Sequence, residues 1–78
     1  MAVYFEFTKM DGTKFAAQCP TVEAAIDQYV ARWLGEIVEA NPRMSGADFE
    51  YARDRMFAFA KAQTWRRVAK LSGHWFRT

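Results

Sequence analysis

The sequence predicts an α+β fold in which a two-stranded antiparallel hairpin packs against two helices in the order ββαα. Apolar residues alternate on both sides of an Asp-Gly dipeptide, which is the pattern of a hairpin. Two later stretches repeat apolar residues every three or four positions, as a helix packed on one side does. In a single domain spanning 1–78 we expect a hairpin at 2–19, helices at 21–40 and 45–72, and a tail at 73–78 that can add a short third strand.

The hairpin is centred on Asp11-Gly12, a dipeptide typical of tight turns. A two-residue turn would place Phe7 opposite Ala16, whereas a three-residue loop would place it opposite Phe15. Only the second register gathers apolar residues alone on one face, and a slip by one residue would exchange the two faces. We therefore expect the three-residue loop, with Gly12 in the left-handed conformation that this loop requires.

The first helix is predicted from apolar residues that keep the helical spacing without a break from Val22 to Val38. Thr21 is a good N-cap, because its hydroxyl can accept a bond from a backbone N–H of the first turn. Asn41-Pro42 ends the helix, since proline cannot continue it. The predicted element is a long amphipathic helix with one face toward the hairpin.

The second helix begins at Ser45, which can cap it, and keeps an apolar stripe as far as Gln63. A helix continuing to Leu71 would be about 39 Å long, whereas a domain of this size is about 30 Å across. We therefore expect the helix either to break near Gln63 or to extend beyond the body of the protein. The stripe expected to face the core is Phe49, Ala52, Met56, Phe59, Ala60 and Gln63. Off the stripe, and candidates for an exposed apolar patch, are Tyr51, Phe57 and Trp65.

The charges are distributed unevenly along the chain. The formal net charge is +2, but all nine acidic residues precede Arg55 and share that part with five basic ones (5 − 9 = −4), and from Arg55 onward six basic residues and no acidic one give +6. This asymmetry indicates that the C-terminal third faces an anionic partner. The same bases could instead stabilise a helix C-terminus or neutralise acidic residues of the first helix. The expected partner-binding residues are Trp65, Arg66, Arg67, Lys70, Trp75, Phe76 and Arg77.

No pattern in the sequence indicates catalysis, a metal or a cofactor. Cys19 and His74 are the available nucleophile and base, and we expect a buried thiol and a solvent-facing imidazole that do not meet. One cysteine can form neither an internal disulfide nor a four-ligand zinc site, and it suits a reducing compartment. The glycines are scattered, so no phosphate-binding loop is expected. We predict that the protein is not an enzyme and uses no cofactor or metal.

A cytoplasmic location without a membrane partner is expected. No apolar run approaches the roughly 20 residues that span a bilayer. The first residues include Glu6 and lack a basic region, which argues against a signal peptide.

Together these features predict a small protein-binding module. No motif identifies a family, but a very short single domain without a catalytic set resembles the small inhibitors that phages and mobile elements encode, anti-CRISPR proteins among them. We expect the basic-aromatic C-terminal surface to contact an acidic or nucleic-acid-handling partner, and the resemblance implies that this contact blocks the partner. The alternative is a nucleic-acid-binding domain that uses the same surface. A homo-oligomer joined through an open hairpin edge is a third expectation.

Overall fold

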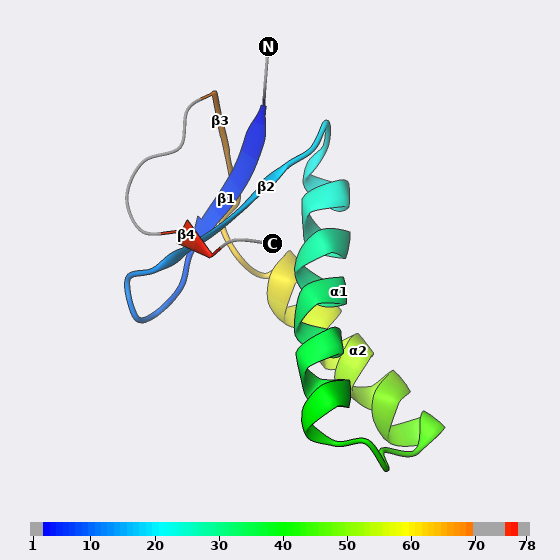
Figure 1. The fold of residues 1–78 in the computed structure, drawn as a ribbon. Helices are drawn as coiled ribbons and strands as arrows, with labels where there is room; N and C mark the ends of the chain where they lie inside the picture. Colours follow the sequence, from blue (N-terminus) through cyan, green and yellow to red (C-terminus); the bar gives the residue numbers. More distant parts are fainter. Residues whose placement is uncertain (1–2, 70–74, 77–78) are drawn as a thin grey trace.

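A computed structural model describes residues 3–69 and 75–76 (Figure 1). The four strands form one sheet in the order β3-β1-β2-β4, and α1, with the end of α2, packs on one of its faces. The predicted α+β class and the order ββαα are confirmed, and the tail does supply a strand. The elements are β1 (Tyr4–Thr8), β2 (Lys14–Gln18), α1 (Val22–Ala40), α2 (Gly46–Lys61), β3 (Arg66–Val68) and β4 (Trp75–Phe76).

The hairpin of β1 and β2 has the register that the three-residue loop predicts. Phe7 lies opposite Phe15, and the Lys9 N–H donates to the Thr13 carbonyl at 2.7 Å to close the loop. Gly12 has φ +87°, in the left-handed region that a side chain would strain. The local turn and the burial of one face therefore fix the same pairing.

Asp11 stabilises the turn from within the loop. Its Oδ1 accepts the backbone N–H of Thr13 at 2.9 Å and the Thr13 hydroxyl at 2.5 Å. The hydroxyl bond first, and the N–H bond second, lower the pKa of the Asp11 carboxyl below its ordinary value. The charged form of Asp11 is thus the one that the folded hairpin prefers.

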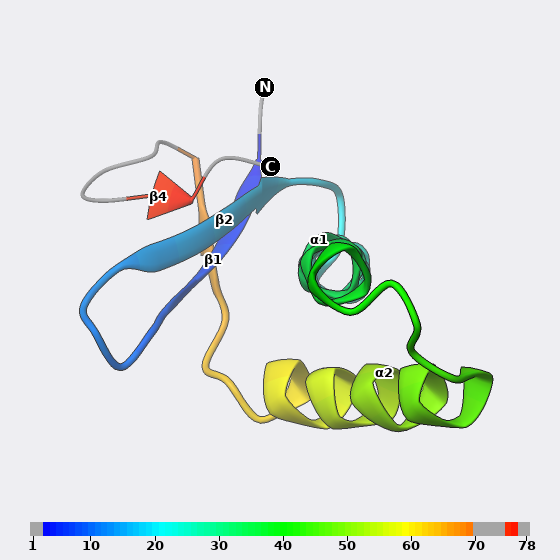
Figure 2. The ribbon, with the colours of Figure 1, turned by 60° about the horizontal axis from the view of Figure 1, so that its bottom comes forward.

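The two helices are capped as their sequences predict. The Thr21 hydroxyl accepts the Ala24 N–H at 3.2 Å before α1, and the Ser45 hydroxyl accepts the Asp48 N–H at 3.1 Å before α2. Helix α1 packs against the hairpin, and α2 packs mainly against α1. Figure 2 looks along α1 and shows α2 crossing it, so that only the last turns of α2 approach the sheet.

Of the two alternatives expected for the second helix, the break near Gln63 is confirmed: α2 ends at Lys61, so the range 45–72 is too long, and residues 66–68 form strand β3. The apolar stripe ends there, and two side chains bond the carbonyls of the last turn. The Gln63 amide donates to the Phe59 carbonyl at 3.0 Å, and the Trp65 indole N–H donates to the Ala60 carbonyl at 2.8 Å. The chain then turns back along β1, which completes an otherwise marginal two-stranded sheet.

The core is an aromatic cluster around Phe7. Its ring lies 4.7 Å from that of Trp65, 5.2 Å from that of Tyr29 and 6.2 Å from that of Phe15, in tilted or edge-on arrangements. Burial raises the pKa of the Tyr29 hydroxyl above its ordinary value. The buried apolar residues of the described chain are Phe7, Phe15, Ala17, Cys19, Ala25, Ile26, Tyr29, Val30, Leu34 and Ala60.

The molecule is more elongated than a compact chain of its length. Its radius of gyration is 13.3 Å, against roughly 11.5 Å expected for 78 residues. The principal extents are 41 × 21 × 21 Å, because the far halves of α1 and α2 project beyond the sheet (Figure 1). The stripe predicted on the second helix does face the core, but it is buried only in part. Ala60 is the one fully buried residue of α2, and the 47% exposed Phe59 still stacks on Tyr29 at 6.1 Å. Partly buried against the core cluster are Phe49, Ala52 and Met56.

Candidate binding surface at the β3 edge

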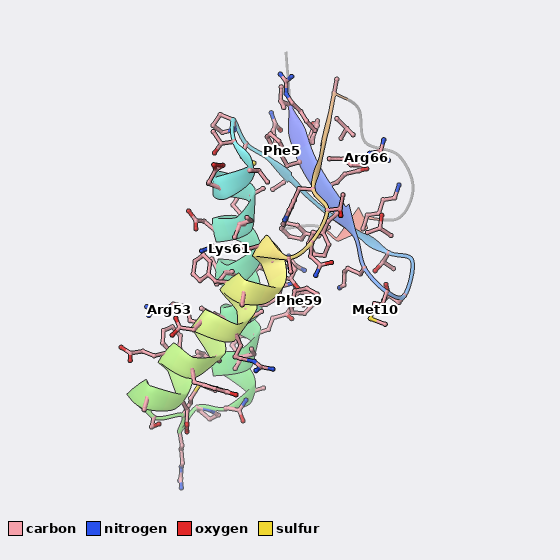
Figure 3. All side chains as sticks on the ribbon, turned by 180° about the vertical axis from the view of Figure 1, so that it is seen from behind. Phe5, Met10, Arg53, Phe59, Lys61 and Arg66 are labelled. Carbon is pink, nitrogen blue, oxygen red and sulfur yellow. The ribbon has the colours of Figure 1, made fainter. Side chains whose placement is uncertain are left out.

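Strand β3 forms one edge of the sheet and carries two of the predicted binding residues. It pairs antiparallel with β1, so that Arg66 lies opposite Glu6 and Arg67 lies opposite Phe5. Because side chains alternate along a strand, Arg67 is on the face toward the helices and Arg66 is on the outer face. Figure 3 shows Phe5 on the helix side of β1 and Arg66 on the opposite side. Both arginines are exposed.

The backbone of β3 is also oriented by this pairing. Bonds from Cys19 N–H to the Val3 carbonyl and from Lys9 N–H to the Thr13 carbonyl show that odd-numbered residues of β1 face β2. Even-numbered residues of β1 therefore face β3, and their partners there are Arg66 and Val68. The N–H and C=O of Arg67, which lies between these two, are directed away from β1 to the open edge.

Arg66 is tied to a buried carboxylate. Its guanidinium lies 3.9 Å from Oε1 of Glu6, whose side chain is 5% exposed, whereas the Arg66 side chain is 70% exposed. The guanidinium therefore compensates the buried carboxylate of Glu6, while most of the Arg66 side chain stays accessible to solvent. This pair could not be predicted from the sequence, because the alternation of the hairpin assigns Glu6 to the face away from the core.

Trp65 is not an exposed contact residue, and the expectation that it belongs to an accessible patch is wrong. Its ring packs against Phe7 and Phe15 at 4.7 and 6.1 Å, and its indole N–H is bonded to the Ala60 carbonyl. The residue is half-buried. It anchors the chain to the core one position before β3 begins, and so holds the two arginines in place.

The remaining predicted binding residues do not gather on the same strand. Trp75 and Phe76 form β4, which pairs in parallel with Lys14 and Phe15 of β2 at the opposite edge. Three strand spacings, roughly 14 Å, separate the two edges. The surface predicted to be continuous is thus divided by β1 and β2. Outside the described residues lie Lys70, His74 and Arg77.

A hollow of about 410 Å³ lies beside the end of β3. It is partly apolar, because the described residues that line it are three apolar residues and one arginine. Sequence reasoning missed it, because it exists only where β1 and β3 pair. Its lining residues in the described part of the chain are Val3, Arg67, Val68 and Ala69.

A second hollow, of about 440 Å³, lies at the far end of the helices. The loop between α1 and α2 forms it, and Arg43 and Asp48 are its charged residues. It shares no residue with the β3 edge. Among residues 3–69 and 75–76, no three His, Cys, Asp or Glu side chains are grouped so that they could hold a metal ion.

Helix α2 presents aromatic residues to solvent. Tyr51 is 66% exposed, as predicted, and the guanidinium of Arg55 lies 5.8 Å from its ring. Phe57 is half-buried, and the Lys61 ammonium lies 5.8 Å from its ring. These cation–π contacts stay within the helix, so they mark no ligand by themselves.

Cys19 is buried, as predicted. Its Sγ lies 3.3 Å from the Thr21 carbonyl and 3.5 Å from the Ala17 carbonyl. Burial raises the pKa of the thiol above its ordinary value, so the unreactive protonated form is favoured. In the described part of the chain no helix is both long and apolar enough to cross a bilayer.

Comparison with known proteins finds no matching family model, no matching curated protein and no matching solved structure.

Proposed function

We propose that the protein is a small, non-catalytic binding module that holds an acidic protein partner at the β3 edge. The observation that carries the proposal is the pair of exposed arginines, Arg66 and Arg67, on opposite faces of an open edge strand. Arginine is among the residues that most often dominate protein interfaces, because its planar fork can bind a carboxylate with two bonds. Two guanidinium groups on consecutive residues of a strand can bind acidic side chains on both faces of the sheet.

The charge of the whole chain supports an acidic partner. The part up to Asp54 has a formal charge of −4 and the part from Arg55 onward has +6. A basic surface of this kind speeds the encounter with an acidic partner and repels a basic one. The module would act as an inhibitor by occupying a surface that the partner needs, as the phage-encoded inhibitors that its profile resembles would. A cytoplasmic location belongs to the same proposal, because a free buried thiol suits a reducing compartment.

Binding of nucleic acid through the same residues is less well supported. A single-stranded nucleic acid is usually held by bases that stack on exposed aromatic rings beside positive charges. Next to the two arginines, Trp65 is packed against Phe7 and its N–H is already bonded to Ala60. The acidic N-terminal part would in addition repel a duplex that wrapped around the domain.

The experiment compares two double variants with the same change of charge. Arg66→Gln with Arg67→Glu removes the proposed contacts, and glutamine at 66 avoids placing a second carboxylate beside Glu6. Arg43→Gln with Arg53→Glu alters exposed arginines of the helix loop and α2 instead. A partner captured by the wild-type chain and by the control pair, but lost with the β3 pair, supports the proposal. Equal capture by both pairs overturns it.

The rival function has its own readout. A mobility-shift assay with duplex and single-stranded DNA is run at low and moderate salt, since phosphate contacts weaken as salt rises. A salt-sensitive shift at micromolar protein that the β3 pair abolishes would replace the protein partner with nucleic acid. Thermal melts of the wild type and the two double variants show whether each variant is folded.

A further inference from the structure

Among residues 3–69 and 75–76, no strand pairs with the outer side of β3, so this edge of the sheet can accept another strand. Strand β1 is paired on both sides, with β2 and β3, whereas β2 is paired with β1 and, at Lys14 and Phe15 alone, with β4. The expected homo-oligomer through a hairpin edge stays a prediction, and the part of β2 after Phe15 is the edge that it would use. On β3, the N–H and C=O of Arg67 point outward, and these are the groups through which an extended peptide adds to a sheet.

The side chains of β3 define what the added strand must carry. Residues directly opposite each other across two strands share a face of the sheet. An acidic residue opposite Arg66 would meet its guanidinium on the outer face, and one opposite Arg67 would meet the second guanidinium on the helix face. The residue opposite Val68 would lie beside the apolar part of the 410 Å³ hollow.

A second copy of the chain is a poor occupant of this edge. Two β3 strands side by side would bring arginines of one copy close to arginines of the other, which is a common device against edge-to-edge pairing. The same charges attract a strand rich in acidic residues. Charge complementarity thus selects a foreign acidic segment over self-association.

We infer that the partner contributes an extended segment of two adjacent acidic residues and one apolar residue, which pairs with Arg66, Arg67 and Val68 as a fifth strand of the sheet. The inference rests on the proposed function and gives it a recognition sequence. In an antiparallel arrangement the segment reads apolar-acidic-acidic from its N-terminus, and in a parallel arrangement it reads acidic-acidic-apolar.

The first test uses short fluorescent peptides and the full chain, with binding followed by anisotropy. One peptide has the core Val-Glu-Glu, one Glu-Glu-Val, one the interrupted order Glu-Val-Glu, and one Val-Lys-Lys. We expect one of the first two to bind up to roughly tenfold more tightly than the interrupted peptide, since the interrupted order loses one of the two charge pairs and the apolar pair with Val68. The better of the two gives the strand direction. Equal binding of all three acidic peptides, or binding of none, overturns the inference.

The second test separates strand addition from attraction between charges. Arg67→Ala and Arg67→Pro both remove the guanidinium, but proline also removes the outward N–H and leaves the pairing with β1 intact. We expect roughly fivefold weaker peptide binding to the proline variant than to the alanine variant, as for one lost hydrogen bond. Wild-type protein with a peptide N-methylated opposite Arg67 repeats the measurement without altering the fold.

The outcomes distinguish the inference from the proposed function. If the proline variant binds as the alanine variant does and the methylated peptide binds normally, the partner meets the arginines without forming a strand, and the inference fails alone. If the Arg66→Gln, Arg67→Glu pair still binds its partner as tightly as the control pair, the proposed function fails as well.

Discussion

The guanidinium of Arg66 lies 3.9 Å from the carboxylate of Glu6, so a charge buried on β1 is compensated by a residue of the edge strand β3. The pair joins positions that lie roughly 60 residues apart in the chain. It links the stability of the sheet to the residue proposed to hold the partner. Binding and folding therefore draw on the same side chain.

Loss of Arg66 should destabilise the protein more than loss of Glu6. Arg66→Ala leaves a carboxylate uncompensated in a site that is 5% exposed, and we expect a cost of about 1–2 kcal/mol in the free energy of unfolding. The figure is well below that of a fully buried pair because the arginine is largely solvated. Glu6→Gln should cost less than about 1 kcal/mol. Urea denaturation of both variants and of the double variant measures the coupling energy between the two side chains. If the two losses of unfolding free energy simply add, the ion pair contributes nothing to stability.

Trp65 should behave as a core residue. Trp65→Ala removes ring contacts with Phe7 and Phe15 and the bond to the Ala60 carbonyl, and we expect a loss of about 3 kcal/mol. Trp65→Phe keeps most of the packing and should lose about 1 kcal/mol, mainly the hydrogen bond. Urea denaturation gives both values. A Trp65→Phe protein that is fully stable but loses its partner would contradict the structural role.

Two glycines should respond to alanine with opposite signs. Gly12 has φ +87°, so Gly12→Ala strains the hairpin loop and should cost about 1 kcal/mol. Gly35 lies within α1, where an added Cβ meets no atom within 4 Å, so Gly35→Ala should stabilise the protein by up to about 1 kcal/mol. Thermal melts of the two variants make the comparison. Two shifts of the same sign would mean that the loop or the helix is formed differently.

Acid should weaken the hairpin loop through Asp11. Its pKa is lowered in the folded state, so its contribution is fully present above the unfolded value and is lost as pH falls through the lower folded value. Thr13→Val removes the hydroxyl bond but keeps the N–H bond. We expect an NMR titration of the Asp11 carboxyl to show a higher pKa in the variant. An unchanged pKa would mean that the hydroxyl does not bond in solution.

The hairpin and α1 could be predicted because their signals are local. The dipeptide Asp11-Gly12, the alternating strands and the unbroken stripe of α1 each describe neighbours in the chain. Strand β3 could not be predicted this way, since three residues show no periodicity and the strand exists only because β1 offers it a partner. Trp65 gave the one local sign of it by leaving the apolar stripe of the second helix.

The binding surface was predicted in part for the same reason. The run of bases correctly indicated the exposure of Arg66 and Arg67, because charge of one sign is costly to bury. The same run of bases could not show where Trp75 and Phe76 lie relative to the arginines. That depends on the strand order, which places β3 and β4 at opposite edges. The burial of Glu6 had no counterpart in the pattern of the strand.

The pairing of β1 with β3 also sets when the edge can first exist. During synthesis the hairpin and α1 leave the ribosome long before the residues of β3, and contacts between distant positions are late events in folding. Until then β1 has one side unpaired and the arginine edge has not formed. The proposed binding at this edge would accordingly begin only after β3 has paired with β1. A nascent chain that still lacks β3 would not bind the partner.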